Sequence, residues 1–208
     1  MGAAPTGVSS EAEYAELGLS SPMDPEALRD ALDAVLPDGL DVVDAVTAAG
    51  PGLPDRIEVS RWRLELPGVD PALLSDAVAK FTAAEQVLVE RLTKQGRRTL
   101  DARAAVVDVR VAGSGTAESP NISEPSRRVA QIGAPSEVSS GPCAILDLVV
   151  RHVTPSVRPD EVLAGLRVVA DLEPPVPVRA TRLAQGTLTE HGEIADPLEV
   201  DRQGTPQR

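Results

Sequence analysis

With 208 residues and an apolar content of 42%, the chain can form one or two domains with real cores, although only three aromatic residues are available to fill them. A net charge of −12 argues against wholesale electrostatic binding to nucleic acid, and a single cysteine excludes disulfide frameworks, zinc knuckles and cysteine-ligated iron–sulfur clusters within one chain. The apolar runs are too short to span a bilayer and the first residues lack signal-peptide features, so we expect a cytoplasmic protein with no membrane partner.

The acidic charge is concentrated at the start of the chain. Residues 1–50 hold ten acidic side chains and one basic one, Arg29, so they contribute −9 of the total −12 and leave −3 for the rest. Such a segment repels phosphate, and we interpret it as a solvated face that keeps the protein soluble. Any contact with nucleic acid is therefore expected later in the chain.

The first 50 residues predict a partial βαβ unit. Apolar side chains that partly alternate in 11–19 indicate a strand, and a second strand is expected in 40–46. Between them, Asp24 and Pro25 provide the N-cap and the first position of a helix. A lone unit of this kind exposes a sheet edge, so it must pack on the rest of the chain or on another chain. Its helix has apolar residues at helical spacing that predict a buried stripe: Leu28, Ala31, Leu32, Val35 and Leu36.

The second unit, 51–188, repeats this pattern at greater length. Asp70 and Pro71 open one helix, and Arg158, Pro159 and Asp160 open another. Half of the residues in 113–142 are Gly, Ser or Pro, which predicts a flexible insertion, and 189–208 reads as a polar disordered tail. Strands are expected in 56–66, 87–92, 104–111, 143–153 and 176–188.

The order of these elements predicts the fold class. Residues 51–188 read strand, helix, strand, strand, helix, strand, with one extra strand before the insertion. That is the split βαβ order of ferredoxin-like domains. We therefore predict an α+β fold in which a ferredoxin-like domain is preceded by a partial, truncated βαβ unit of the same kind, 1–50.

Four stretches, in the order GAAPTGVSSEAEY, LPDGLDVVDA, RLTKQGRRTLDAR and VRPDEVLAGL, carry a family resemblance. From Gly2 to about Gly186, leaving out 113–142, the chain resembles the radical-SAM-associated (radical-SAM-linked) bacterial protein family, a domain of unknown function. The domain occurs there as a separate protein or fused to a radical-SAM, cobalamin-type enzyme. The resemblance implies an accessory protein with a radical-SAM enzyme as its partner. The chain lacks the three cysteines of such an enzyme, and we expect no cofactor in it.

Family members carry a further N-terminal segment, with a strand, a helix and a basic stretch, that has no counterpart before Gly2 here. This departure agrees with the half-motif in 1–50 and implies a truncated or mis-started polypeptide. Two consequences are expected: self-association through the exposed N-terminal half-domain, or a fragment with no independent activity.

The stretch 89–103 is compact and basic, and it contains a glycine turn at Gly96. Clustered cations at such a turn can bind a phosphate backbone. The resemblance carries over Lys94 and Arg103, together with Asp101 between them. The alternative is an ordinary exposed basic hairpin in which Asp101 pairs with Arg103 or Arg98. Arg158 precedes a helix N-terminus, which favours anions. The candidates for anion or RNA binding are therefore Lys94, Arg97, Arg98, Arg103 and Arg158.

A second candidate site surrounds His152, which follows an apolar strand and stands near Asp160. His152 could act as a general base with Asp160. The competing interpretation is a strand-end histidine and a helix-capping aspartate. Cys143 leads into the apolar strand, so a buried, inert thiol is expected, and no metal site is predicted.

Together these observations predict a non-catalytic, acidic accessory domain that docks on a radical-SAM enzyme and presents RNA or another anionic substrate through the basic turn. The alternative from another class is a hydrolase or transferase that uses His152 and Asp160.

Overall fold

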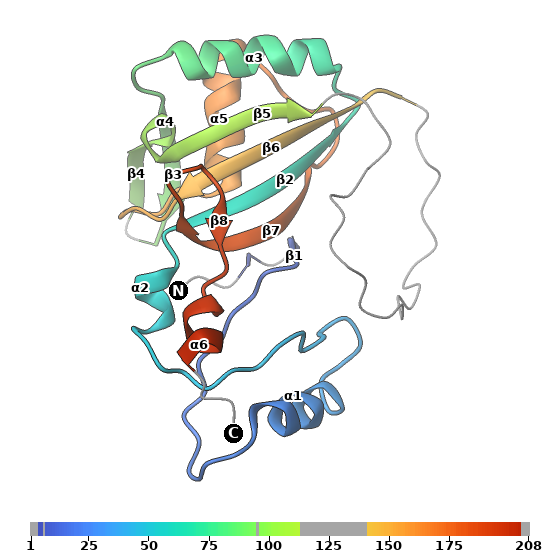
Figure 1. Cartoon of the computed structure of the whole chain (residues 1–208). Coiled ribbons are helices and arrows are strands. Elements are labelled where there is room, and N and C mark those ends of the chain that lie inside the picture. The colour runs from blue at the N-terminus through green and yellow to red at the C-terminus, as the bar shows by residue number, and fades with distance from the viewer. Residues whose placement is uncertain (1–3, 6, 95, 113–140, 205–208) are drawn as a thin grey trace.

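The computed structural model of the protein describes residues 4–5, 7–94, 96–112 and 141–204. Helices cover one face of a central sheet, so the predicted α+β class is confirmed (Figure 1). The predicted insertion 113–142 lies outside the described residues apart from its last two positions. The helices are α1 Pro25–Asp33, α2 Leu53–Arg56, α3 Pro71–Ala83, α4 Ala102–Ala105, α5 Pro159–Ala170 and α6 Glu199–Gly204. The strands are β1 Ser9–Ser10, β2 Val59–Pro67, β3 Leu88–Thr93, β4 Gly96–Asp101, β5 Val106–Ala112, β6 Cys143–Arg151, β7 Arg179–Leu188 and β8 Ile194–Ala195.

Strand β2 is central to the main sheet, whose order is β1-β7-β2-β6-β5, with β8 added on β7. It pairs antiparallel with β6, from Val59 opposite Arg151 to Pro67 opposite Cys143, and antiparallel with β7 on its other side. Because side chains alternate along a strand, Trp62 and Leu64 face the helices while Arg63 faces away. The register against β7 shifts between Arg61 and Trp62, as it does at a β-bulge.

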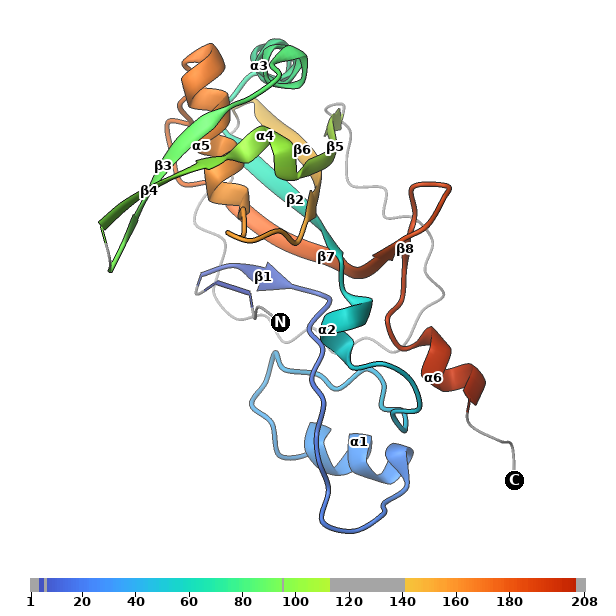
Figure 2. The same ribbon diagram turned by 90° about the vertical axis from the view of Figure 1, so that its left-hand side faces the viewer.

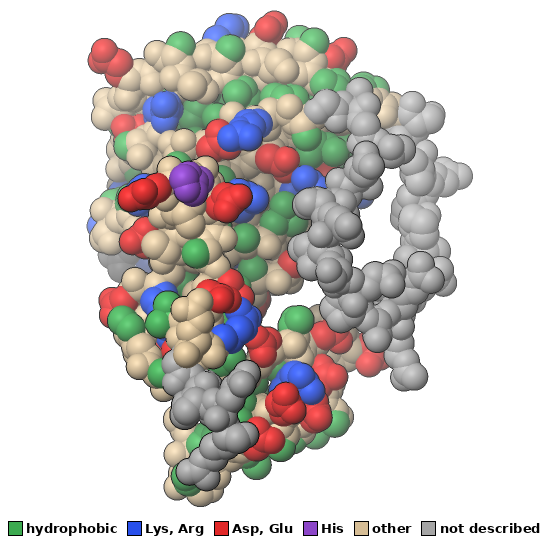
Figure 3. Space-filling view, viewed as in Figure 1, with side chains coloured by type: hydrophobic (Ala, Val, Ile, Leu, Met, Phe, Trp, Pro, Cys, Tyr) green, Lys and Arg blue, Asp and Glu red, His purple; other side chains and the backbone are tan. Residues whose placement is uncertain are grey.

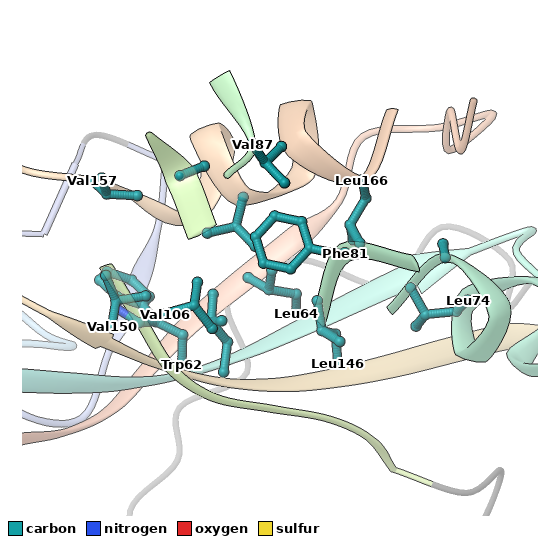
Figure 4. Packing of buried hydrophobic residues seen from close by; sticks show 14 of the residues in the cluster. Trp62, Leu64, Leu74, Phe81, Val87, Val106, Leu146, Val150, Val157 and Leu166 are labelled. Atoms are coloured by element: carbon teal, nitrogen blue, oxygen red, sulfur yellow. The ribbon is translucent and has the colours of Figure 1, made fainter. Parts of the chain in front are cut away.

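Phe81 lies at the centre of the core between the sheet and the helices (Figure 4). It is fully buried on α3, and a Cβ added at Gly165 of α5 would lie 2.8 Å from its ring and 3.2 Å from Val87. The missing side chain at Gly165 therefore lets the two helices approach closely. With so few aromatic residues in the chain, Leu and Val fill most of the remaining space, including Leu74, Leu146 and Leu166.

Both main helices begin where the sequence predicts. Pro71 starts α3, and the carboxylate of Asp70 accepts a hydrogen bond from the backbone N–H of Ala72 at 2.7 Å. Pro159 starts α5 in the same way. Proline at the first helical position has no N–H to leave unsatisfied, which explains why these two signals are reliable.

The strand that leaves the main sheet is not the one expected. Residues 106–112 join the sheet as β5 next to β6, while β3 pairs with β4 in a separate two-stranded sheet. Strand β4, with the sequence GRRTLD, has few apolar residues and no alternation, so the sequence analysis did not predict it. Because β3 is satisfied by β4, this hairpin stands beside the main sheet and not within it (Figure 2).

The predicted strands in 11–19 and 40–46 are wrong, because both stretches are irregular. Of the described residues in the first 50, only Ser9 and Ser10 belong to a strand of the sheet, where they pair in parallel with β7. A strand needs a neighbouring backbone to bond with, and the chain beyond Glu11 has left the sheet edge. Helix α1 is present, but the predicted burial of its apolar stripe is also wrong, because none of its residues is buried.

The tail predicted as disordered is ordered over 189–204 and holds the start of the chain in place. Buried Asp201 on α6 accepts a hydrogen bond from Arg56 at 2.6 Å and another from the backbone N–H of Ala49 at 2.9 Å. Arg202 bonds Asp44 at 2.6 Å. Burial, and then the neighbouring Asp196, raise the pKa of Tyr14 to about 12. These long-range contacts order the segment even though its polar composition predicts disorder.

We predict that Gly186→Ala detaches β8 and α6 from the body. A Cβ at Gly186 would collide with the backbone carbonyl of Ala195, which cannot rotate away. The substitution should lower the free energy of unfolding by about 1–3 kcal/mol, as overpacking does, and increase amide hydrogen exchange in 194–204. Gly18→Ala, at a position with open space around it, is the matched control. Equal stability of the two variants would contradict the prediction.

Candidate functional site

The β3–β4 hairpin presents the basic stretch singled out in the sequence. Its register places Leu92 opposite Arg97 and Thr93 opposite Gly96. Gly96 has φ +111°, a conformation that side chains other than glycine rarely adopt, and the Thr93 hydroxyl donates to the Gly96 carbonyl at 2.8 Å. The turn therefore depends on the predicted glycine.

Lys94, Arg97 and Arg98 are exposed near the end of this hairpin. Arg97 pairs with Glu90 across the strands at 2.9 Å, but both side chains are largely in solvent and such pairs contribute little. Within the described part of the chain, neither Lys94 nor Arg98 forms an ion pair. The hairpin therefore holds two cations that have no ion-pair partner among the described residues.

Asp101 does not neutralise Arg98 or Arg103, which was the alternative interpretation. Its carboxylate accepts hydrogen bonds from the backbone N–H groups of Val87 at 3.0 Å and Arg103 at 2.9 Å. It thereby caps α4 and ties the hairpin ends together. The guanidinium of Arg103 turns inward and donates to the Val106 carbonyl at 3.1 Å. Arg103 is therefore a structural residue in this arrangement, unlike Lys94, Arg97 and Arg98.

The hairpin is braced against the start of α5 by two residues that sequence reasoning missed. Arg91 donates to Glu161 at 2.6 Å and to the Ser156 carbonyl at 2.7 Å. The second carboxylate oxygen of Glu161 accepts from the backbone N–H of Arg158 at 2.7 Å. Arg91 also lies opposite Arg98 in the hairpin register, so the Arg98 and Arg158 positions flank the same junction. The spacing of Glu161, three residues after Arg158, is a sequence signal that could have revealed the role of Glu161.

The open face of the main sheet is charged, and several of its charges are paired with each other (Figure 3). Arg63 bonds Asp147 at 3.0 Å, and Arg179 lies 3.4 Å from Glu65. Trp62 lies on the opposite, helix-covered face beneath Arg182, whose guanidinium carbon is 4.6 Å from the ring centre. The described part of this face thus carries no aromatic ring on which a base could stack. The hairpin is the better candidate for binding an anion.

His152 and Asp160 are not brought together by any hydrogen bond among the described residues. His152 Nε2 instead lies 2.7 Å from the hydroxyl of Ser60, and Ser60 lies 3.4 Å from Gln185. Gln185 in turn donates to the Ala12 carbonyl at 2.6 Å. This series of contacts connects Ala12, which follows β1, to the sheet. Because Ser60 is only 2% exposed, its hydroxyl has little access to a substrate.

Two hollows of the described surface are not lined by His152, although Val153 and Thr154, which follow it, line one of them. One, of about 430 Å³, lies between α5 and the proline-rich loop 174–178. The other, of about 370 Å³, lies between the base of β4 and the loop 153–157. Among the described residues, no cluster of three or more His, Cys, Asp or Glu side chains could hold a metal ion. Cys143 is exposed, and the expectation of a buried thiol was wrong.

Within the described chain, none of the helices is both long and apolar enough to cross a membrane. A family model described as "Uncharacterized protein conserved in bacteria (DUF2344)" matches residues 1–159. No curated protein and no solved structure matches the chain.

We predict that Arg91→Ala loosens the hairpin. The pair of Arg91 and Glu161 is mostly shielded from water, with side-chain exposures of 20% and 12%, so its loss should be measurable. A double-mutant cycle with Glu161→Ala should give a coupling energy on the order of 1 kcal/mol or more. Arg97→Ala with Glu90→Ala, an exposed pair on the same hairpin, is the control and should give less. A coupling near zero for Arg91 and Glu161 would refute the brace.

We also predict that His152 makes folding weaker in acid. Burial lowers the pKa of His152, and the nearby charge of Arg182 acts in the same direction. The unfolded chain, with a histidine pKa near 6.5, then takes up the proton more readily. The contribution of neutral His152 to the free energy of unfolding is fully present above about pH 6.5 and decreases as the pH drops below that value. His152→Gln should flatten this part of the urea-denaturation pH profile, whereas His191→Gln should not. Parallel profiles for wild type and His152→Gln would contradict the assignment.

Proposed function

The chain belongs to the DUF2344 family of uncharacterized proteins conserved in bacteria, and we propose that it is a non-catalytic accessory protein whose basic hairpin binds RNA or another anionic substrate. The observation that carries the proposal is the pair of cations without an ion-pair partner among the described residues, Lys94 and Arg98, on a hairpin braced by Arg91. A rigid support reduces the entropy lost when these side chains bind a phosphate.

The form of binding follows from the kind of contact that the hairpin offers. Lys94, Arg97 and Arg98 can approach phosphates, but the described hairpin has no aromatic side chain to stack on bases. Binding is therefore expected to depend on salt and to vary little with sequence. The acidic N-terminal segment favours contact confined to the hairpin over contact across the whole surface.

The proposed partner is a radical-SAM enzyme. The support for it is the sequence resemblance alone, and the chemistry would belong to the partner, since one cysteine in 208 residues cannot hold that enzyme's three-cysteine cluster. The proposed accessory role places the protein in the cytoplasm, where RNA substrates occur.

We further propose that the body of the protein is ferredoxin-like. Neighbouring strands in the order β7-β2-β6-β5 run antiparallel. The connection through α3 leads from β2 to β5, with β6 between them, and the connection through α5 leads from β6 to β7, with β2 between them. That order is the one a split βαβ motif produces, with the β3–β4 hairpin inserted after α3. Ferredoxin-like sheets often bind RNA through their open face, whereas here the proposal assigns binding to the inserted hairpin.

We predict that Lys94→Ala with Arg98→Ala weakens the binding of a labelled single-stranded RNA and removes most of its dependence on salt. Each phosphate contact contributes about 0.7 to the slope of log K against log salt, so two lost contacts should lower the slope by roughly 1.4. Fluorescence anisotropy over a salt series measures this. Lys80→Ala with Arg167→Ala removes the same charge from exposed positions on α3 and α5 and is the matched control. Unchanged binding by the hairpin variant would remove the hairpin from the proposal.

A further inference from the structure

The segment 13–48, which we call the acidic lobe, has a defined conformation but no core of its own. Every residue from 13 to 52, all of them described, is at least partly exposed. Val35 is 77% exposed and Val43 is 76% exposed. Apolar side chains of this size gain free energy when another surface covers them, so the lobe has the character of an unfilled interface. Other exposed apolar residues of the lobe are Leu17, Leu19, Met23, Leu36 and Leu40.

The lobe also carries charge that the rest of the molecule does not neutralise. It contains nine acidic residues and one basic residue, a balance of −8, and Arg29 is already paired with the adjacent Asp30 at 2.7 Å. Asp44 bonds Arg202 in the body. Figure 3 shows acidic side chains gathered beside hydrophobic ones on the face of the lobe that it displays. Five acidic residues form no ion pair with any described residue: Asp24, Glu26, Asp33, Asp38 and Asp41.

The hairpin presents the complementary surface in the same chain. Leu92 is 81% exposed and Leu88 is 49% exposed, and the register puts both on the side of the hairpin that carries Arg97. Glu90, the partner of Arg97, lies on the same side, and Lys94 follows at the turn, whereas Arg98 lies opposite Arg91 on the other side of the hairpin. Exposed apolar side chains flanked by cations fit exposed apolar side chains flanked by carboxylates, which is the usual form of electrostatic complementarity at an interface.

The lobe cannot cover the hairpin of its own molecule. Figures 1 and 2 both place α1 at one end of the molecule and the hairpin beside the helices of the sheet. Contacts with the body hold the lobe there: Glu13 accepts from Arg182 at 2.8 Å, Glu16 from the Leu53 N–H at 3.0 Å, and Asp44 from Arg202 at 2.6 Å.

From this complementarity we infer that the acidic lobe of one copy docks on the β3–β4 hairpin of a second copy. A two-fold arrangement makes the contact twice, once in each direction, and closes the assembly at a dimer. The apolar residues of both surfaces are covered, and the carboxylates of the lobe meet Lys94, Arg97 and Arg98.

The inference deepens the proposed function, on which the following consequence rests. The lobe occupies the cations that would bind RNA, so self-association and RNA binding exclude each other. By linkage, RNA must then dissociate the dimer to the same degree that dimerisation weakens RNA binding. The acidic lobe thus serves as a regulator of the hairpin.

Sedimentation equilibrium of the full chain over a range of concentration and salt tests the docking directly. We expect a dimer at low salt that weakens as salt is raised. Asp38→Lys with Asp41→Lys, or Lys94→Glu with Arg98→Glu, should each raise the dissociation constant at least about tenfold, since like charges then meet. An equimolar mixture of the two reversed variants should associate again, because each supplies one complementary contact.

Controls separate docking from charge and folding effects. Lys80→Glu with Arg167→Glu changes the net charge as the hairpin variant does and should leave the dimer intact. Val35→Ser with Val43→Ser keeps every charge and should still weaken it, with an unchanged circular dichroism spectrum because both side chains are exposed. A wild type that stays monomeric at low salt, or a hairpin variant that dimerises normally, would overturn the inference.

RNA binding and dimerisation can be tested independently of each other. RNA binding by a protein that never dimerises would leave the proposed function standing and reject the docking. A salt-sensitive dimer that RNA does not dissociate, and that binds no RNA in its monomeric form, would support the docking and reject the proposed function.

Discussion

The approach of Phe81 to Gly165 is the contact on which the arrangement of this protein depends. The chain has few aromatic rings, and the packing of α3 and α5 on the sheet is centred on the ring of Phe81. The two helices can approach this closely because Gly165 has no side chain. Val87, which leads into the hairpin, completes the same contact. The position of α5 then determines where Glu161 meets Arg91, so the orientation of the exposed cations follows from a buried apolar contact.

The molecule separates two kinds of surface that would neutralise each other if they lay side by side. The lobe is acidic and apolar, and the hairpin is basic and apolar. Between them stands a sheet whose open face carries the ion pairs of Arg63 with Asp147 and of Arg179 with Glu65. This separation explains how a protein with a net charge of −12 can present a local positive surface. Net charge describes solubility and long-range attraction, whereas recognition depends on the few groups that reach a ligand.

The parts of the fold that could be predicted are those whose signals are local. Asp70-Pro71 and the proline at 159 fixed the starts of α3 and α5, and apolar patterning found β2, β6 and β7. The partly alternating apolar residues in 11–19 led to the wrong prediction of a strand. A strand forms only where a neighbouring strand can pair with it, and the sequence does not reveal that neighbour. For the candidate site, Lys94 and Arg98 were identified from composition, whereas the inward turn of Arg103 and the brace from Arg91 required long-range contacts.

The bond between Arg56 and Asp201 joins residues that are 145 positions apart. The lobe is therefore synthesised well before the residues that position it, Asp201 and Arg202. The sheet can form before then, since β7 ends at Leu188. Until Asp201 and Arg202 have been made, the lobe lacks these contacts, and its many carboxylates disfavour aggregation of its exposed apolar side chains.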